Sequence, residues 1–362
     1  AASSGMRKGE IFHFDSVCGC VETALRQAEE AGNLTINEVY LAMSGSQIEG
    51  LPHRGEIPVD GEITQEHVDH VLRVAKEVTL PADRQILHSI VGQYSVDGLC
   101  GVNPVGMVGK TLAADVLIVH GLYSRMINLV RVVKALKLDV VELLFSGLCS
   151  AMAALSAEQK LQGVLLIDLG GGTTDYVAYA QAKIADAGVI GVGGDHVTND
   201  IARAFRLATT EAEALKRQHG DAMVNAAGRT RRIPLPAAAG EAPRTVKQSD
   251  LQTIVHLRME ETFGMIRARL AQQNLLHLLG GGVVLTGGGA LLKNAPQLAE
   301  KVFGLPCEIG VPRNVGGLTA NLAVPEYATG VGAVLCGYKN VRQKAEQAGS
   351  VWKKLGHWFG IG

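Results

Sequence analysis

One run of ten residues, from Leu166 to Asp175, holds the residue types best suited to bind a phosphate. It reads Leu-Ile-Asp-Leu-Gly-Gly-Gly-Thr-Thr-Asp, so an apolar strand delivers Asp168 to its end and three glycines follow. Glycines allow a tight turn whose backbone N–H groups can face phosphate oxygens, and the threonines add hydroxyl donors. A plain glycine hairpin is the competing interpretation, which the flanking residues disfavour. The candidate phosphate ligands are Gly170, Gly171, Gly172, Thr173 and Thr174.

Asp168 needs a different partner from the glycines, because a carboxylate and a phosphate repel each other. Mg²⁺ is a hard cation that prefers oxygen ligands and keeps several waters. We therefore predict that Asp168 holds Mg²⁺, directly or through water.

A second apolar strand, Val283 to Thr286, also ends in three glycines. Glycine lets a flat base or sugar approach the backbone without a Cβ clash, although a tight strand–helix turn explains this segment alone equally well. Considered with the first run, it predicts one nucleotide held between two turns that converge in space. The residues of this second turn are Gly287, Gly288 and Gly289.

A third glycine segment contains Gly193 and Gly194 and opens a predicted helix. Backbone amides at a helix start suit an anion or a ribose. On the next predicted helix, Glu213 and Lys216 are spaced i and i+3 on one face. They could bind ribose hydroxyls and the adenine edge, and an exposed surface ion pair is an equal alternative.

Other kinds of site are disfavoured by the sequence. It has no GxxxxGK[ST] motif, so it is not a P-loop protein, and no nucleophile–His–Asp arrangement stands out; Ser44 is interpreted as part of a turn. The six cysteines are scattered without metal-ligand spacing and are expected to be reduced thiols. A formal net charge of −1 provides no basic field for nucleic acid, so no nucleic-acid partner is expected.

The last residues form an amphipathic pattern. As a helix, 351–362 would place its large apolar side chains on one side and its lysines elsewhere, and both tryptophans of the chain lie here. These are marks of a helix that lies in a membrane interface; a terminal helix packed on its own domain is the alternative. One short helix binds reversibly, so it suits a self-associating protein. The predicted membrane residues are Trp352, Lys353, Lys354, Leu355, Trp358 and Phe359.

The length of 362 residues fits two lobes. Strands alternate with helices in both halves, which predicts two α/β lobes. No stretch reaches the roughly 18 apolar residues that cross a bilayer, and no signal peptide opens the chain, so it is expected neither to span a membrane nor to be exported. Expected elements include helices over 16–31, 64–75, 125–136, 197–205, 210–219, 250–279 and 331–337, and strands over 38–43, 84–94, 115–120, 163–168 and 283–286, with a hairpin over 176–187.

The two glycine turns resemble known nucleotide-binding motifs. The segment from Asp168 to Asp175 resembles the second phosphate motif of the actin, heat-shock chaperone and sugar kinase superfamily, and 286–290 resembles its adenosine motif. Segments 145–151 and 327–333 are similar to its two interlobe connector helices. Within that superfamily the chain resembles the FtsA family along nearly its whole length, including segments 39–45, 61–68 and 103–107.

That resemblance implies a fold, ligands and partners. The fold would be α/β, a two-lobed actin-like (ribonuclease H-like) architecture with the extra subdomain of FtsA. It implies ATP and Mg²⁺ as cofactors, head-to-tail polymers of the chain with itself, and a membrane-targeting C-terminal helix. It also implies capture of the FtsZ C-terminal peptide on the far subdomain of the second lobe, where Arg258 resembles a basic position. The protein would act at the division site, on lipids at the cytoplasmic face of the cell membrane.

The same resemblance implies a division of the chain into subdomains. The first-lobe subdomain 1A would comprise 1–43 and 120–160, and the extra subdomain 1C 44–119. The nucleotide-binding subdomain 2A would comprise 161–192 and 281–338, and the far subdomain 2B 193–280. A linker over 339–350 and the membrane helix over 351–362 would follow.

Two features depart from the family pattern. The family carries a first phosphate loop, Asp-x-Gly-Thr, on its first strand; this sequence starts after that strand, so the first N-terminal strands are expected to be missing from the fold. In addition, His256 and Leu257 stand before Arg258 where an acidic residue and a proline are usual.

Two other functions compete with the membrane tether. One is an ATPase or kinase of the same superfamily. No general base for a substrate hydroxyl stands out, so at most slow ATP hydrolysis is expected. The other is an actin-like scaffold of pilus assembly, similar to PilM, which would not need Trp352 and Trp358 for membrane contact.

Overall fold

The apolar run 164–167 belongs to a buried strand that leads into the first glycine turn. The computed structural model describes residues 2–236, 244–313 and 322–342. All six residues of this strand are buried, as its apolar sequence predicts. It lies within a nine-stranded sheet whose strands are, in spatial order, β15 (Cys307–Ile309), β14 (Val283–Thr286), β9 (Val164–Leu169), β10 (Thr174–Ala180), β11 (Lys183–Ile190), β4 (Glu49–Glu62), β7 (Val108–Leu122), β5 (Arg84–Val96) and β6 (Leu99–Cys100).

Strand register brings the two glycine turns to one edge of this sheet. β14 runs parallel to β9, with Thr286 opposite Asp168, so both strands end at the same level. β10 returns antiparallel beside β9 and places Asp175 opposite Asp168. Four helices pack with these strands around one hydrophobic core: α6 (Gly194–Phe205), α7 (Thr209–His219), α8 (Gln248–Gln272) and α9 (Ala295–Phe303).

The first lobe is built around a parallel pair of strands, β3 (Glu38–Met43) and β8 (Asp139–Phe145). A short hairpin of β1 (Met6–Arg7) and β2 (Glu10–Ile11) precedes them. α1 (Phe14–Gly32) packs against α3 (Tyr123–Ala135). α4 (Ser146–Ala154) and α5 (Ala157–Gln162) follow β8 and lead into β9.

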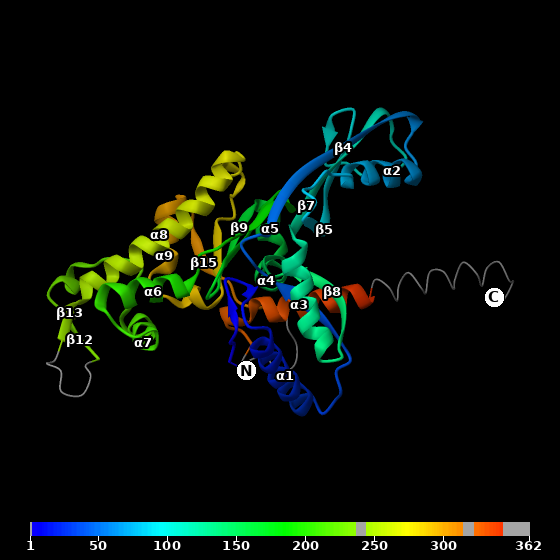
Figure 1. The fold of residues 1–362 in the computed structure, drawn as a ribbon. Coiled ribbons are helices and arrows are strands. Elements are labelled where there is room, and N and C mark those ends of the chain that lie inside the picture. The colour runs from blue at the N-terminus through cyan, green and yellow to red at the C-terminus, as the bar shows by residue number, and fades with distance from the viewer. Residues whose placement is uncertain (1, 237–243, 314–321, 343–362) are drawn as a thin grey trace.

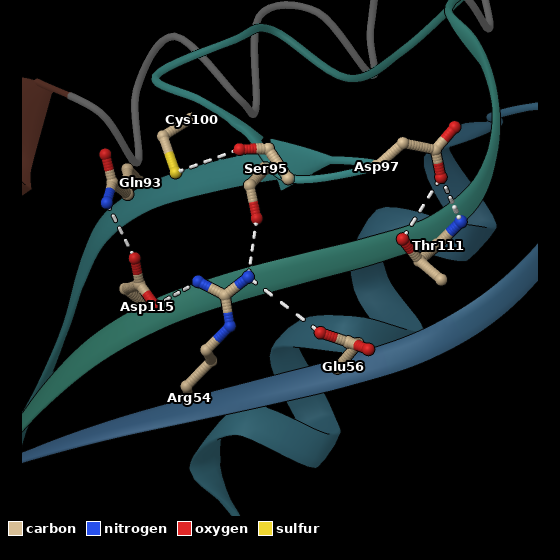
Figure 2. Close-up of polar contacts among 9 residues, drawn as sticks. Arg54, Glu56, Gln93, Ser95, Asp97, Cys100, Thr111 and Asp115 are labelled. Atoms are coloured by element: carbon tan, nitrogen blue, oxygen red, sulfur yellow. Dashed lines mark hydrogen bonds and ion pairs between the residues drawn. The ribbon is translucent and has the colours of Figure 1, made fainter.

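The long strands β4, β5 and β7 extend away from both lobes together with α2 (Gln65–Lys76), as Figure 1 shows at the upper right. They have a hydrophobic core of their own, and α2 packs on β4 and β7. Figure 2 shows how the strands are linked on one side: Arg54 of β4 donates to Asp115 of β7 at 3.0 Å and to Ser95 of β5 at 2.9 Å.

Strand β4 was not predicted, because its sequence contains Pro52 and Pro58. Proline lacks the N–H that a central strand must donate and is confined to edges and bulges. Here one side of β4 pairs along its length with β7. The other side of β4 pairs with β11 at a single position, where Glu49 of β4 lies opposite Gly188 of β11. The rest of that side is an edge that tolerates proline.

Most predicted elements are confirmed within a few residues, and three boundaries are wrong. The strand predicted over 115–120 begins seven residues earlier, at Val108 of β7. The helix predicted over 250–279 ends at Gln272, where Asn274 takes a left-handed φ of 57° and a short 3-10 turn, η2 (Leu276–Leu278), follows. The predicted linker begins too early, because residues 328–342 are helical. The Ala-, Pro- and Arg-rich stretch 225–247 is interpreted from its sequence as a long loop or a poorly ordered hairpin; its described residues form η1 (Ala226–Arg229) and a hairpin of β12 (Arg232–Leu235) and β13 (Arg244–Lys247).

The contact between α4 and the helix over 328–342 gives a testable prediction. A Cβ added to Gly332 would lie 1.8 Å from the carbonyl oxygen of Cys149. Gly332→Ala should therefore lower the free energy of unfolding by about 1–3 kcal/mol, the usual cost of overpacking. Gly264→Ala is the matched control, because nothing lies within 4 Å of its added Cβ. Chemical denaturation measures both, and equal stability of the two variants would contradict the close contact.

Candidate functional site

The two glycine turns lie side by side, which confirms that they converge. Gly287 has a φ of 78°, and a Cβ there would lie 2.3 Å from Oδ1 of Asp168. A Cβ on Gly289 would lie 2.7 Å from the Cβ of Leu169. Any larger residue at either position would separate the strands, so glycine is what allows η3 (Gly288–Leu291) to pack on the end of β9.

A cleft of about 530 Å³ opens between these turns and α6, α7 and α8. Its volume is in the range of small-ligand sites. The structure therefore gathers residues from four separate predicted segments around one hollow. The predicted site residues on its walls are Gly170, Gly171, Thr174, Gly193, Gly194, Glu213, Lys216, Gly288 and Gly289.

The start of α6 rests directly on the first glycine turn. The N–H groups of Gly194 and Asp195 donate to the carbonyl oxygens of Gly170 and Gly171 at 2.9 and 2.8 Å. A Cβ on Gly193 would lie 2.5 Å from the carbonyl oxygen of Gly171. These two helix amides are thus used within the protein, which corrects the expectation that the helix start offers them to an anion or a ribose.

The predicted hydroxyl donors are also engaged by the protein. Thr174 donates its hydroxyl to the carbonyl oxygen of Val192 at 2.7 Å, and the hydroxyl of Thr173 lies 3.0 Å from that of Ser44. Gly172 and Thr173 do not line the cleft; Gly172 faces a neighbouring hollow that also contains Lys8. A phosphate in the cleft would meet the backbone of the turn rather than these hydroxyl groups.

The predicted pair of Glu213 and Lys216 forms a wall of the cleft. Their side chains are 31% and 14% exposed and lie 2.7 Å apart, so the alternative of an exposed surface pair is excluded. Lys216 also donates to the carbonyl oxygen of Gly194 at 3.0 Å and to Thr198 at 2.8 Å. Burial opposes ionisation of Glu213, but hydrogen bonds from Lys216 and Thr198 outweigh it and lower its pKa to about 2.

Asp168 lies buried at the junction of the two lobes. Its Oδ2 accepts from Ser150 of α4 at 2.5 Å and from Thr329 of the helix over 328–342 at 2.9 Å. The segments predicted as connector helices therefore both reach this carboxylate. Burial raises the pKa of Asp168, and the two hydrogen bonds oppose that change.

Asp175 is a second buried carboxylate that the sequence interpretation missed. It lies opposite Asp168 in the β9–β10 register and accepts a hydrogen bond from Ser44. Burial raises its pKa well above the usual range, and the neighbouring Asp168 raises it further. The signal was present in the sequence, because a hairpin centred on the glycines must place residues 168 and 175 opposite each other. Interpreting Ser44 as part of a turn likewise did not reveal that its hydroxyl donates to Asp175.

This donor set fits Mg²⁺ better than a metal held wholly by protein. Within the described residues, no group of three or more His, Cys, Asp or Glu side chains could enclose a metal ion. Mg²⁺ typically binds one or two carboxylates and takes its other ligands from phosphate and water. Asp168, whose Oδ1 accepts no hydrogen bond from the described part of the chain, could supply such a carboxylate.

Arg258 lies outside the cleft, in the neighbouring hollow. It donates to Asp200 at 2.6 Å and also pairs with Glu261. The hydrogen bond with Asp200 raises the pKa of Arg258 despite partial burial. Its charge is thus balanced within the chain, and its role in partner binding stays a prediction.

The predicted membrane residues within 351–362 lie outside the described residues. In the part of the chain that is described, no helix combines the length and apolar character needed to cross a bilayer.

Comparison with known sequences identifies two matching family models. The model described as "Cell division protein FtsA" matches residues 165–332, and "SHS2 domain inserted in FTSA" matches 45–120. The chain is 34% identical to cell division protein FtsA of Escherichia coli K12 over 367 residues, covering 99% of this chain and 87% of that protein. It is 33% identical to FtsA of Pseudomonas aeruginosa over 337 residues, covering 92% and 81%.

Comparison with solved structures shows the two-lobed actin-like fold. A PilM–PilN type IV pilus biogenesis complex matches with a TM-score of 0.64 and 17% identity, over 93% of this chain and 89% of that one. MreB5 of Spiroplasma citri, solved bound to ADP, matches with a TM-score of 0.59 and 16% identity, over 95% and 80%.

The buried carboxylate pair predicts a pH-dependent change in stability. Because the pKa of Asp175 is raised on folding, the folded state favours its protonated form, and stability falls as pH rises from about 4 through the raised pKa. Asp175→Asn removes this ionisation and should raise the free energy of unfolding at pH 7 by about 0.5–2 kcal/mol. The gain should shrink towards pH 4, where the wild-type carboxyl is also neutral.

Denaturation between pH 4 and 8 tests this, with the exposed Asp139→Asn as the matched control. A lower stability of Asp175→Asn than of the wild type at pH 7 would contradict this prediction, because it would show that the folded protein stabilises the charged carboxylate.

Proposed function

The chain belongs to the FtsA family of cell division proteins, and on that premise we propose that it binds ATP with Mg²⁺, polymerises head to tail and tethers FtsZ filaments to the cytoplasmic face of the membrane at the division site. The observation that carries the nucleotide part is the convergence of two glycine turns on one cleft. The ADP bound to the structurally similar MreB5 is consistent with this proposal.

The cleft suggests how the nucleotide would be held. The N–H of Gly171 would face the phosphates, because that of Gly170 already donates to the carbonyl oxygen of Thr173 at 3.0 Å, and Gly288 and Gly289 would lie against the adenosine. The Glu213–Lys216 pair presents both an acceptor and a donor on the opposite wall, suited to ribose hydroxyls and the adenine edge. Mg²⁺, when bound near Asp168, would neutralise phosphate charge and relieve the repulsion between Asp168 and Asp175.

Filament formation and membrane attachment would depend on each other. A short amphipathic helix over 351–362 binds one chain weakly and reversibly. Many helices on one filament bind firmly, because each attached subunit raises the effective concentration of the next helix at the membrane. ATP binding between the lobes would favour the polymerised form, and the FtsZ C-terminal peptide would attach to the second lobe, where Arg258 is the proposed contact.

Gly288 offers a direct test of the nucleotide site. A Cβ there meets no protein atom closer than the Cγ of Glu326 at 3.6 Å, so Gly288→Val should fold normally while its side chain enters the cleft. We expect the affinity for ATP to fall at least roughly tenfold, about 1.4 kcal/mol of binding free energy, with the melting temperature unchanged. Isothermal titration with ATP and Mg²⁺ measures this.

The control for that variant is Gly19→Val in α1, another glycine with open space around its added Cβ. It should bind ATP like the wild type. Normal ATP binding by Gly288→Val would place the nucleotide elsewhere.

The tether predicts two separable losses. Removing residues 351–362 should abolish sedimentation with vesicles that contain anionic lipid, because the aromatic and lysine side chains that enter the interface are gone. Binding of an FtsZ C-terminal peptide should be retained.

Arg258→Ala should keep vesicle sedimentation and lower the affinity for the FtsZ C-terminal peptide, because it removes the proposed cationic contact. Vesicle sedimentation and fluorescence anisotropy of labelled peptide measure the two, and unchanged sedimentation of the shortened chain would count against the tether.

A further inference from the structure

A second hollow, of about 350 Å³, lies next to the nucleotide cleft and has a positive surface. Four cationic residues line it, Arg7, Lys8, Arg203 and Arg258, against the two carboxylates of Asp195 and Asp200. Lys8 and Arg7 belong to the β1–β2 hairpin of the first lobe, whereas Arg203 lies on α6 of the second lobe. The hollow is therefore built from both lobes.

Three of these cations have no partner in the described part of the chain. Arg258 is matched by Asp200 and Glu261, but the side chains of Arg7, Lys8 and Arg203 form no hydrogen bond or ion pair with a described residue. The neighbouring His196 experiences their field: burial lowers its pKa, and the charges of Lys8 and Arg258 lower it further. An anion in this hollow would be attracted by charges that the protein leaves uncompensated.

The first glycine turn leads from the nucleotide cleft into this hollow. Gly170 and Gly171 line the cleft, Gly172 lines the hollow, and Asp195 lines both. The backbone of Lys8 lies directly over the turn, since a Cβ on Gly172 would lie 3.0 Å from the amide nitrogen of Lys8. If the adenosine lies against Gly288 and Gly289, its phosphates would extend along the first glycine turn. The last phosphate would then leave the cleft beside Lys8.

We propose that Lys8, assisted by Arg7 and Arg203, binds the terminal phosphate of a nucleoside triphosphate in this hollow and thereby distinguishes it from a diphosphate. The proposal rests on the nucleotide site proposed above and extends it to one more phosphate. Asp195 would disfavour a bare anion here, so the ligand is the triphosphate with its Mg²⁺ ion. Because Lys8 and Arg203 come from different lobes, one phosphate between them would also link the lobes only in the triphosphate state.

The test compares ATP, ADP and AMP binding, each with Mg²⁺, to the 362-residue chain and its variants. Lys8→Ala should reduce affinity for a non-hydrolysable ATP analogue roughly tenfold, as expected for loss of a charge-assisted hydrogen bond, and change ADP and AMP affinity less than about twofold. Arg203→Ala should act in the same direction, and Lys8→Arg should restore most of the preference. The exposed Arg26→Ala in the same lobe is the matched control for loss of one positive charge and should keep the wild-type preference.

The outcomes separate this proposal from the one on which it rests. If the wild type binds none of the three nucleotides, the proposed nucleotide site fails and this inference fails with it. If the wild type binds ATP but Lys8→Ala and Arg203→Ala keep its preference for ATP over ADP, only the inference is overturned. Equal losses of ATP, ADP and AMP affinity would also overturn it, because Lys8 would then act on a part common to all three. Melting curves of each variant confirm that the fold is intact.

Discussion

The carboxylate of Asp168 is the point on which the two lobes converge. It lies buried at the end of β9, where Ser150 of α4 and Thr329 of the helix over 328–342 donate to the same oxygen. A buried charge without such donors is expensive, so these hydrogen bonds fix the strand end against both connecting helices. The backbone of Gly287 packs against the other oxygen, which brings the second glycine turn to the same place. The positions of the cleft walls and of the two connecting helices therefore all depend on the side chain of Asp168.

The same carboxylate is a reason to expect the structure to respond to a ligand. Asp175 lies opposite it; burial raises the pKa of both groups, and the neighbouring Asp168 raises the pKa of Asp175 further. A cation bound here would remove that repulsion, and the helices that hold Asp168 would sense it directly. The end of the cleft beside the first glycine turn is therefore linked through hydrogen bonds to the elements that join the lobes.

Another buried carboxylate, Asp186, helps to join the extended strands to the rest of the sheet. Arg269 at the end of α8 donates to Asp186 of β11 and to the carbonyl oxygen of Gly50 in β4, both at 3.2 Å. β4 and β11 are otherwise registered at one residue pair, so Arg269 bridges the place where the sheet is weakest. A buried ion pair adds little net stability, but it specifies one orientation because an unpaired Asp186 would be costly. α8 also lines the cleft between the glycine turns through Met259 and Thr262, and so contacts both regions.

The sequence by itself determined the buried strands, the glycine turns and the family, because apolar runs, glycine spacing and motif order are local properties of the chain. It also indicated the cleft, since two strands that end in glycines must meet if they lie parallel in one sheet. Only the tertiary structure decided which of the predicted hydrogen-bond donors remain available to a ligand. The amides of Gly194 and Asp195 and the hydroxyl of Thr174 are used by carbonyl oxygens that come close only after folding. It also decided that β4 tolerates two prolines, because one side of that strand is an edge, and that Lys8 lies beside Gly172, because contacts between residues far apart in the chain leave no periodic signal in the sequence.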